Sequence, residues 1–291
     1  MMQITVLIDN NGKDGLLCEW GLSFLIDTAD RRILLDFGAS DKFASNANAL
    51  GTDLSTVDCA VLSHAHHDHG GGIPKFLELN NKALLYIAAA AAEDCWAGGR
   101  SHSRKGLWAS LFGLRYIGLP AGTLALAGDR ILRVPPAHHE SDLRKVPIGE
   151  HAWIVPHCGA QKAGRKQKLY RMHGGWLRPD GLQHELTLVC ASDGGLVVLS
   201  SCSHAGPEAI LKEVQEAFPG TKIHTFIGGL HLYRTSRDGV LEVARAFQDA
   251  GVERIYTGHC TGDAAIAILR ESISVGQLCS GMKICFPIQD N

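Results

Sequence analysis

The sequence lacks any long apolar run. No stretch approaches the ~20 consecutive apolar residues that a helix needs to cross a bilayer, so we expect no membrane partner. A secretory signal is lacking too, because the first ten residues carry no basic segment and the apolar run from Ile4 to Ile8 is too short for a signal core. These absences predict a cytoplasmic protein.

An excess of positive charge is also missing. The net charge at pH 7 is −2, and the charged fraction of 20% and the hydrophobic fraction of 45% are ordinary for a globular protein. A dedicated nucleic-acid-binding protein normally carries a basic excess. We therefore expect no nucleic-acid partner.

The sequence has no C-x-x-C motif and no low-complexity linker. Its nine cysteines are odd in number and scattered, which favours free thiols in a reducing compartment over a disulfide framework. A chain of 291 residues can form one large domain or two small ones. Because nothing in the composition marks a boundary, we predict one domain over residues 1–291.

Histidine, in contrast, is abundant, with 15 in the chain. Residues 57–72 read VDCAVLSHAHHDHGGG, a short buried strand that runs into histidines and then into three glycines. Residues two apart in an extended segment point the same way, so His64 and His66 are placed to share one cation. The chain then turns and carries Asp68 and His69 towards a second ion.

The ligand types in this cluster indicate which metals fit. Imidazole and carboxylate together suit zinc, manganese or iron(II) better than calcium. We therefore predict a site for two divalent metal ions, with zinc favoured over manganese or iron. His67 lies between the two pairs and is expected to face away from the metals. The alternative for the whole stretch is a polar, solvated turn.

A buried strand that runs out into small residues and offers a histidine recurs at His204, His231 and His259. Sites in layered α/β folds are built at strand ends, so these residues are expected to converge on one pocket. We predict His204 and His259 as further metal ligands. His184, Cys202 and His231 are left open as ligands or substrate contacts, and a core or supporting position is the alternative for the two histidines.

Two other features are expected around the site. Asp36 ends a predicted strand beside a glycine, where it would either cap the loop or orient a ligand histidine from behind. The basic, glycine-rich stretch 98–106 carries Arg100, Arg104 and Lys105. These side chains either lie on a mobile surface loop or form a lid that binds an anionic substrate, since arginine grips phosphate and carboxylate with paired hydrogen bonds.

The order of the predicted elements indicates two mixed β-sheets packed face to face with helices outside, an αββα sandwich of the α/β class. Within residues 90–180 only short strands are predicted, at 114–117, 123–126 and 130–134. The rest of that segment does not resolve into elements. We interpret it as an elaboration that covers the active site.

The spacing His-x-His-x-Asp-His at residues 64–69 resembles the signature of the metallo-β-lactamase fold superfamily. Together with four further segments, it is similar to the metal-dependent hydrolases of the "β-lactamase superfamily II" type, which include the dihydropterin-ribofuranosyl-aminobenzene phosphate synthases. The resemblance implies the αββα fold and a dinuclear metal centre, with His259 as the last ligand histidine and Asp36 behind a ligand. The further segments are residues 21–26 (GLSFLI), 202–206 (CSHAG), 227–232 (IGGLHL) and 258–262 (GHCTG).

The sequence departs from the family pattern at two points. The family normally has an aspartate that bridges the two metals at the strand end where this chain has Ser201 and Cys202. The resemblance therefore leaves Cys202 or His204 for the bridging position. Trp20 follows Glu19 where the family often has a histidine, which implies a different substrate pocket.

These features predict a dinuclear metal-dependent hydrolase in which a metal-bound hydroxide attacks a small anionic substrate, a phosphoester or an ester- or lactone-like compound. Asp68 is the predicted catalytic residue, because its carboxylate would orient the nucleophile or move its proton. The first alternative is a pterin-type transferase, like the synthases above, in which an aromatic nucleophile displaces pyrophosphate. The second is a non-catalytic, metal-bound sensor. The sequence leaves a homo-oligomer open.

Overall fold

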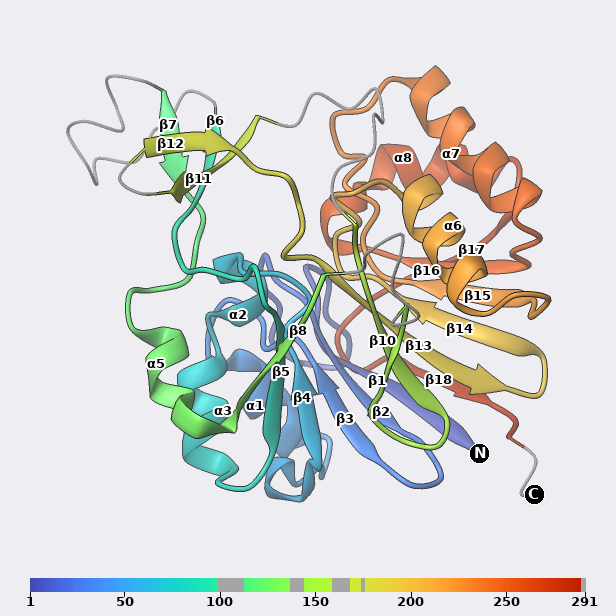
Figure 1. The fold of residues 1–291 in the computed structure, drawn as a ribbon. Helices are drawn as coiled ribbons and strands as arrows, with labels where there is room; N and C mark the ends of the chain where they lie inside the picture. Colours follow the sequence, from blue (N-terminus) through green and yellow to red (C-terminus); the bar gives the residue numbers. More distant parts are fainter. Residues whose placement is uncertain (99–112, 137–143, 159–167, 174–175, 289–291) are drawn as a thin grey trace.

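Two seven-stranded β-sheets stack face to face, with helices on both outer faces and a small third sheet beyond them (Figure 1). The computed structural model describes residues 1–98, 113–136, 144–158, 168–173 and 176–288. The predicted αββα sandwich of two mixed sheets is confirmed. No helix among the described residues combines the length and the apolar character that crossing a membrane requires.

The first sheet comes from the N-terminal part of the chain and is completed by the last described strand. Its order is β18-β1-β2-β3-β4-β5-β8, antiparallel from β18 to β3 and parallel from β3 to β8. β4 carries the histidine cluster at its carboxyl end and is buried throughout. The strands are β1 (Met2–Ile8), β2 (Ser23–Asp27), β3 (Arg32–Leu35), β4 (Cys59–Val61), β5 (Leu84–Ala88), β8 (Ile131–Val134) and β18 (Lys283–Phe286).

The second sheet has the order β17-β16-β15-β14-β13-β10-β9. It is parallel from β14 to β17, so the carboxyl ends of β14, β15 and β16 lie at one edge. Its strands are β9 (Val146–Pro147), β10 (Ala152–Pro156), β13 (Leu186–Ser192), β14 (Gly195–Leu199), β15 (Ile223–Ile227), β16 (Arg254–Thr257) and β17 (Ser274–Gln277). The third sheet contains β6 (Cys95–Gly98), β7 (Leu114–Tyr116), β11 (Leu169–His173) and β12 (Trp176–Pro179).

The helices divide between the two outer faces (Figure 1). On the first sheet lie α1 (Lys42–Ala49), α3 (Ile73–Leu79) and α5 (Thr123–Ala127), with the short α2 (His67–Gly70) at its end. On the second lie α6 (Pro207–Ala217), α7 (Arg237–Asp249) and α8 (Asp263–Leu269). Single 3-10 turns occur at Leu54–Thr56, Gly128–Arg130 and His259–Thr261.

Alternation along the strands divides the hydrophobic core into two layers. In β13, Leu188 belongs to the cluster between the two sheets, whereas the next residue, Val189, belongs to the cluster under α6, α7 and α8. Successive strand residues point to opposite faces, so a central strand covered on both sides needs apolar residues at every position. The rigid strands that result end at the histidines described below.

The segment 90–180 differs from its prediction in several places. Residues 123–126 are helical in α5 and not a strand, because the apolar stretch TLALA between Gly122 and Gly128 is too short to reveal its period. β10 was not predicted, although it is buried and pairs with β13 over five residues. Arg100, Arg104 and Lys105, the predicted substrate lid, lie outside the described residues.

Candidate metal centre

Strand ends from both sheets bring the predicted histidines to one place. His64 and His66 follow β4, His69 lies in α2, His204 follows β14 and His259 follows β16. The ring centroid of His64 lies 4.5 Å from that of His66, 4.2 Å from that of His69 and 4.9 Å from that of His204. The His69 and His259 centroids are 5.1 Å apart. Residues nearly 200 positions apart in the sequence therefore form one cluster of imidazole rings.

One group of three donors is placed for a first cation. The ligand atoms of His64, His66 and His204 lie within 4.8 Å of one another, and all three side chains are buried. His66 is held at its backbone by an isolated bridge to Gly118, which precedes α5. Three imidazoles with room for a further ligand are the arrangement of a catalytic zinc site.

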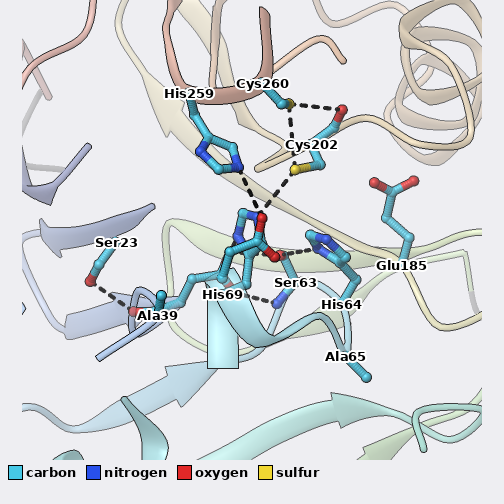
Figure 2. Close-up of polar contacts among 12 residues, drawn as sticks. Ser23, Ala39, Ser63, His64, Ala65, His69, Glu185, Cys202, His259 and Cys260 are labelled. Carbon is cyan, nitrogen blue, oxygen red and sulfur yellow. Dashed lines mark hydrogen bonds and ion pairs between the residues drawn. The ribbon is translucent and has the colours of Figure 1, made fainter. Parts of the chain in front are cut away.

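A second group lies beside the first and includes a sulfur. His69 Nε2 is 3.1 Å from Cys202 Sγ, and His259 Nε2 is 3.6 Å from Asp68 Oδ2 (Figure 2). Cys202 Sγ in turn lies 3.5 Å from Cys260 Sγ. Imidazole, carboxylate and thiolate donors suit zinc and its neighbours among the transition metals.

A hydrogen-bond network behind the histidines fixes the direction of their rings. Asp36 Oδ2 accepts from Ser63 Oγ at 2.6 Å and lies 2.8 Å from His69 Nδ1, while Asp36 Oδ1 accepts from Ser63 N at 2.7 Å. Ser63 Oγ also lies 2.8 Å from His64 Nδ1. Each contact occupies Nδ1 and leaves Nε2 facing the cavity, which is how a supporting residue fixes the tautomer of a ligand histidine.

His259 is fixed from the N-terminal segment. Its Nδ1 lies 3.0 Å from Asn10 Oδ1, and Asp9 Oδ2 accepts from its backbone N–H at 3.1 Å. Burial raises the pKa of Asp9 to about 6 against the lowering effect of these hydrogen bonds. Asp9 and Asn10, which follow β1, therefore support a candidate ligand about 250 residues away in the sequence.

The residues present fit divalent cations. The buried Nε2 atoms of His64, His66 and His259 have no hydrogen-bond partner among the described residues. A buried polar atom left without a partner costs about 1–3 kcal/mol, so three of them facing one cavity are unfavourable unless a cation binds there. The donor types and the buried Nε2 atoms without hydrogen-bond partners both indicate metal ions.

Burial also sets the protonation of the site. It lowers the pKa of His66 to about 3 and, with neighbouring imidazoles, the pKa values of His64 and His204 well below their usual range. For His69, burial lowers the pKa, but the charges of Asp36 and Asp68 outweigh it and raise the value to about 9. His64, His66 and His204 are therefore neutral at pH 7, the form in which histidine binds a metal.

Several residues near the site adopt an unusual backbone. Four of the six non-glycine residues with positive φ in the described part of the chain lie here: Asp36 at 59°, Ser203 at 54°, His231 at 49° and His259 at 45°. Such conformations cost of order 1–3 kcal/mol each and cluster at functional sites. At the end of β15, a Cβ on Gly229 would meet Cys260 Sγ at 2.6 Å, so only glycine permits this approach.

The three residues left open by the sequence have different surroundings. Both ring nitrogens of His184 are engaged, Nε2 with Asp180 Oδ2 at 2.9 Å and Nδ1 with the backbone N–H of Ala65 at 3.3 Å. His184 thus supports the backbone between His64 and His66. His231 lies 4.6 Å from His204, centroid to centroid, and its buried Nδ1 has no hydrogen-bond partner among the described residues. Cys202 lies between the two donor groups.

Some supporting residues have no signal in the sequence. Glu185 is buried and accepts from the backbone N–H groups of His204 and Ala205, both at 2.8 Å, which fixes the loop after β14. Ser63 stands directly before the first histidine, and only the structure identifies its two contacts. His67 is exposed, in agreement with the orientation expected for it.

Comparisons with known proteins agree with this geometry. A model of the metallo-β-lactamase superfamily matches residues 21–161. A curated relative, the 7,8-dihydropterin-6-methyl-4-(β-D-ribofuranosyl)-aminobenzene-5′-phosphate synthase of Methanocaldococcus jannaschii, is 26% identical over 83% of this chain and 81% of its own length. An uncharacterised protein of the same organism is 24% identical over 92% and 94%.

Solved structures extend the match to the whole fold. A metal-dependent hydrolase of the β-lactamase superfamily, Tm1679, is 28% identical, covers 99% of this chain and 100% of its own, and superposes with a TM-score of 0.80. The Zn²⁺-bound PqqB of Methylobacterium extorquens is 10% identical over 98% and 100%, with a TM-score of 0.55, and shares the fold. The chain thus has the metallo-β-lactamase fold, and its residues 21–161 match the model of that superfamily.

Proposed function

We propose that the protein is a dinuclear metal-dependent hydrolase that acts on a small anionic substrate, a phosphoester or an ester- or lactone-like compound. The convergence of His64, His66 and His204 with the His69–Cys202–His259 group carries this proposal. Two adjacent donor groups are required for a site in which two metal ions stabilise the attacking and leaving oxygens. We assign His64, His66 and His204 to one ion, and Asp68, His69 and His259 to the other, with Cys202 between them.

The bound cations would supply Lewis acidity, lowering the pKa of water and polarising a phosphoryl or acyl oxygen. The chain's own residues do the rest. Asp36 and Ser63 hold the rings of His69 and His64 with Nε2 inward. Asp68 stays ionised, because nearby histidines outweigh the effect of burial and hold its pKa well below the usual range. Its carboxylate is therefore available to bind a cation and to accept a hydrogen bond that orients the attacking water.

The first experiment compares two neighbouring histidines. His66→Ala removes a buried candidate ligand, whereas His67→Ala removes an exposed histidine from the same segment. We expect the His66 variant to bind one fewer equivalent of zinc and to lose hydrolysis of phosphoester and lactone substrates, and the His67 variant to keep both. Full turnover by His66→Ala would refute the proposal.

A second candidate function is a transferase that displaces pyrophosphate. The synthase relative, matched over most of both chains, favours it. In this reaction the methylene carbon of a dihydropterin methyl diphosphate would form a bond to the aminobenzene partner as its bond to the diphosphate oxygen breaks. Pyrophosphate release that requires the aminobenzene compound would support the transferase. Release from the diphosphate alone, at the same rate, would support the hydrolase.

A further inference from the structure

Two large aromatic side chains beside the candidate metal centre are exposed to solvent. Trp20 is 50% exposed and Tyr233 is 44% exposed. Their ring centroids lie 6.0 Å apart at an interplanar angle of 78°, so the two rings form a corner. Single exposed aromatic residues are common, but a pair at a site is not explained by core packing. We call this pair the aromatic corner.

The aromatic corner contacts candidate metal ligands directly. The Trp20 ring lies 5.1 Å from the ring of His259, and its Nε1–H donates to Asp68 Oδ2 at 3.0 Å. The Tyr233 ring lies 5.3 Å from the ring of His231. A substrate group that packs on the exposed face of either ring is therefore separated from the candidate metal ligands by a single aromatic side chain.

Backbone contacts fix both rings in place. Glu19, the neighbour of Trp20, accepts from the backbone N–H groups of Ala39 and Ser40 at 2.8 and 3.1 Å. Tyr233 N–H donates to the carbonyl of Cys260 at 3.3 Å, next to His259 in the sequence. Gly262 has φ +80°, and a Cβ there would meet the backbone of Tyr233 at 3.0 Å.

The cationic side chain of Arg234 lies beside the aromatic corner. The guanidinium of Arg234 lies 5.2 Å from the centroid of the Tyr233 ring, within the range of a cation–π contact. Arg234 is exposed, so its charge is available to an anion in solution. Exposed aromatic rings with a cation beside them suit a planar ring that carries a negative charge.

We propose that Trp20 and Tyr233 form a subsite that stacks a planar aromatic group of the substrate, joined by a short link to the anionic group that reacts at the metal centre. This inference rests on the proposed function for the location of the reacting group. It adds the substrate class, aromatic compounds with a phosphate or carboxylate a few bonds away. Stacking on one aromatic side chain contributes enough for about a tenfold or greater preference over a saturated ring.

The test uses two phosphonates that cannot be hydrolysed, so that binding is measured apart from turnover. They are naphthalen-2-ylmethyl phosphonate and its saturated decahydro analogue, which share charge and linker but differ in planarity. In isothermal titration calorimetry with the full, zinc-loaded chain, the naphthyl compound should bind at least tenfold tighter than the decahydro compound. Tyr233→Leu and Trp20→Leu should each reduce that ratio to threefold or less.

Two further variants separate stacking from indirect effects. Trp20→Phe keeps an aromatic face but loses the N–H bond to Asp68, and it should keep most of the preference. Trp176→Leu removes another exposed tryptophan, 73% exposed in β12, and should leave the ratio unchanged. If Trp20→Leu does not fold, Tyr233→Leu alone decides.

The outcomes distinguish this inference from the proposed function. Equal binding of the two phosphonates, binding of neither, or a ratio unchanged in Tyr233→Leu would overturn the subsite, while hydrolysis by the same protein would leave the proposed function intact. A naphthyl preference that both Leu variants abolish, in a protein that hydrolyses nothing, would support the subsite and refute the hydrolase. A Trp20→Phe variant that loses as much as Trp20→Leu would overturn the stacking role of Trp20.

Discussion

The substitution Asp36→Asn tests how the site orients its ligands. Asp36 is fully buried, with Oδ2 facing His69 Nδ1 and Oδ1 accepting from Ser63 N. Asparagine fits the same space, but if its carbonyl keeps the bond to Ser63 N, its amide donates where Oδ2 accepted. His69 Nδ1 must then accept a hydrogen bond, which places the ring proton on Nε2, the atom that faces Cys202.

The magnitude follows from this change of tautomer. A histidine protonated at Nε2 cannot donate that nitrogen to a cation, and loss of a supporting residue typically lowers metal affinity about 10–100-fold. This corresponds to about 1.4–2.7 kcal/mol in binding free energy. Ser63 also loses its acceptor at Oδ2, so the position of His64 weakens with it.

The assay is competition for zinc between the metal-free protein and a chromophoric chelator. Asp27→Asn is the control, because Asp27 pairs with Arg32 at the partly exposed end of a hairpin. Circular dichroism confirms that both variants are folded. Zinc affinity of Asp36→Asn within twofold of the parent protein would show that Asp36 does not orient the ligands.

Three further predictions concern the metals and the frame. Cys202→Ser should abolish the sulfur-to-metal charge-transfer absorption of the cobalt(II)-substituted protein, and an unchanged spectrum would remove Cys202 from the ligand set. Zinc at 100 times its dissociation constant should stabilise the fold by about 2.7 kcal/mol for each ion bound, measured by denaturation with and without chelator, and no difference would contradict binding to the native state. His157 contacts buried Glu213, and although burial lowers the pKa of His157, this hydrogen bond and charge outweigh it and raise the pKa. The stabilisation is present below the unfolded pKa of about 6.5 and is lost as the pH rises through the raised value, so His157→Phe should cost about 3 kcal/mol at pH 6 and less at a pH above the raised value. Equal costs at the two pH values would contradict the charged pair.

The part of the site that the sequence predicts is the part encoded locally. His64 and His66 are two apart on an extended segment, so their shared direction follows from strand geometry alone. His204 and His259 follow the same pattern of a buried strand that ends in small residues. Asn10 and Glu185 carry no such signal, because their roles depend on contacts with His259 and His204, made only after folding.

The fold was predictable to a similar extent and for the same reason. The strands predicted at 114–117 and 130–134 are present as β7 and β8. Residues 123–126, predicted as a strand, belong to helix α5, since the short stretch TLALA between glycines fits both periods. Trp20 was recognised as a departure from the family, but its contact with Asp68 required coordinates.

The pairing of β1 with β18 has a consequence for biosynthesis. Asp9 and Asn10 hold His259, and they directly follow β1, which pairs with β18, the last strand in the described part of the chain. While the nascent chain is still emerging from the ribosome, the histidines after β4 are synthesised before His204 and His259, the other histidines of the candidate metal centre. The proposed metal site, which uses His204 and His259 as well, can therefore form only after the strands that precede these two histidines and β18 have been synthesised.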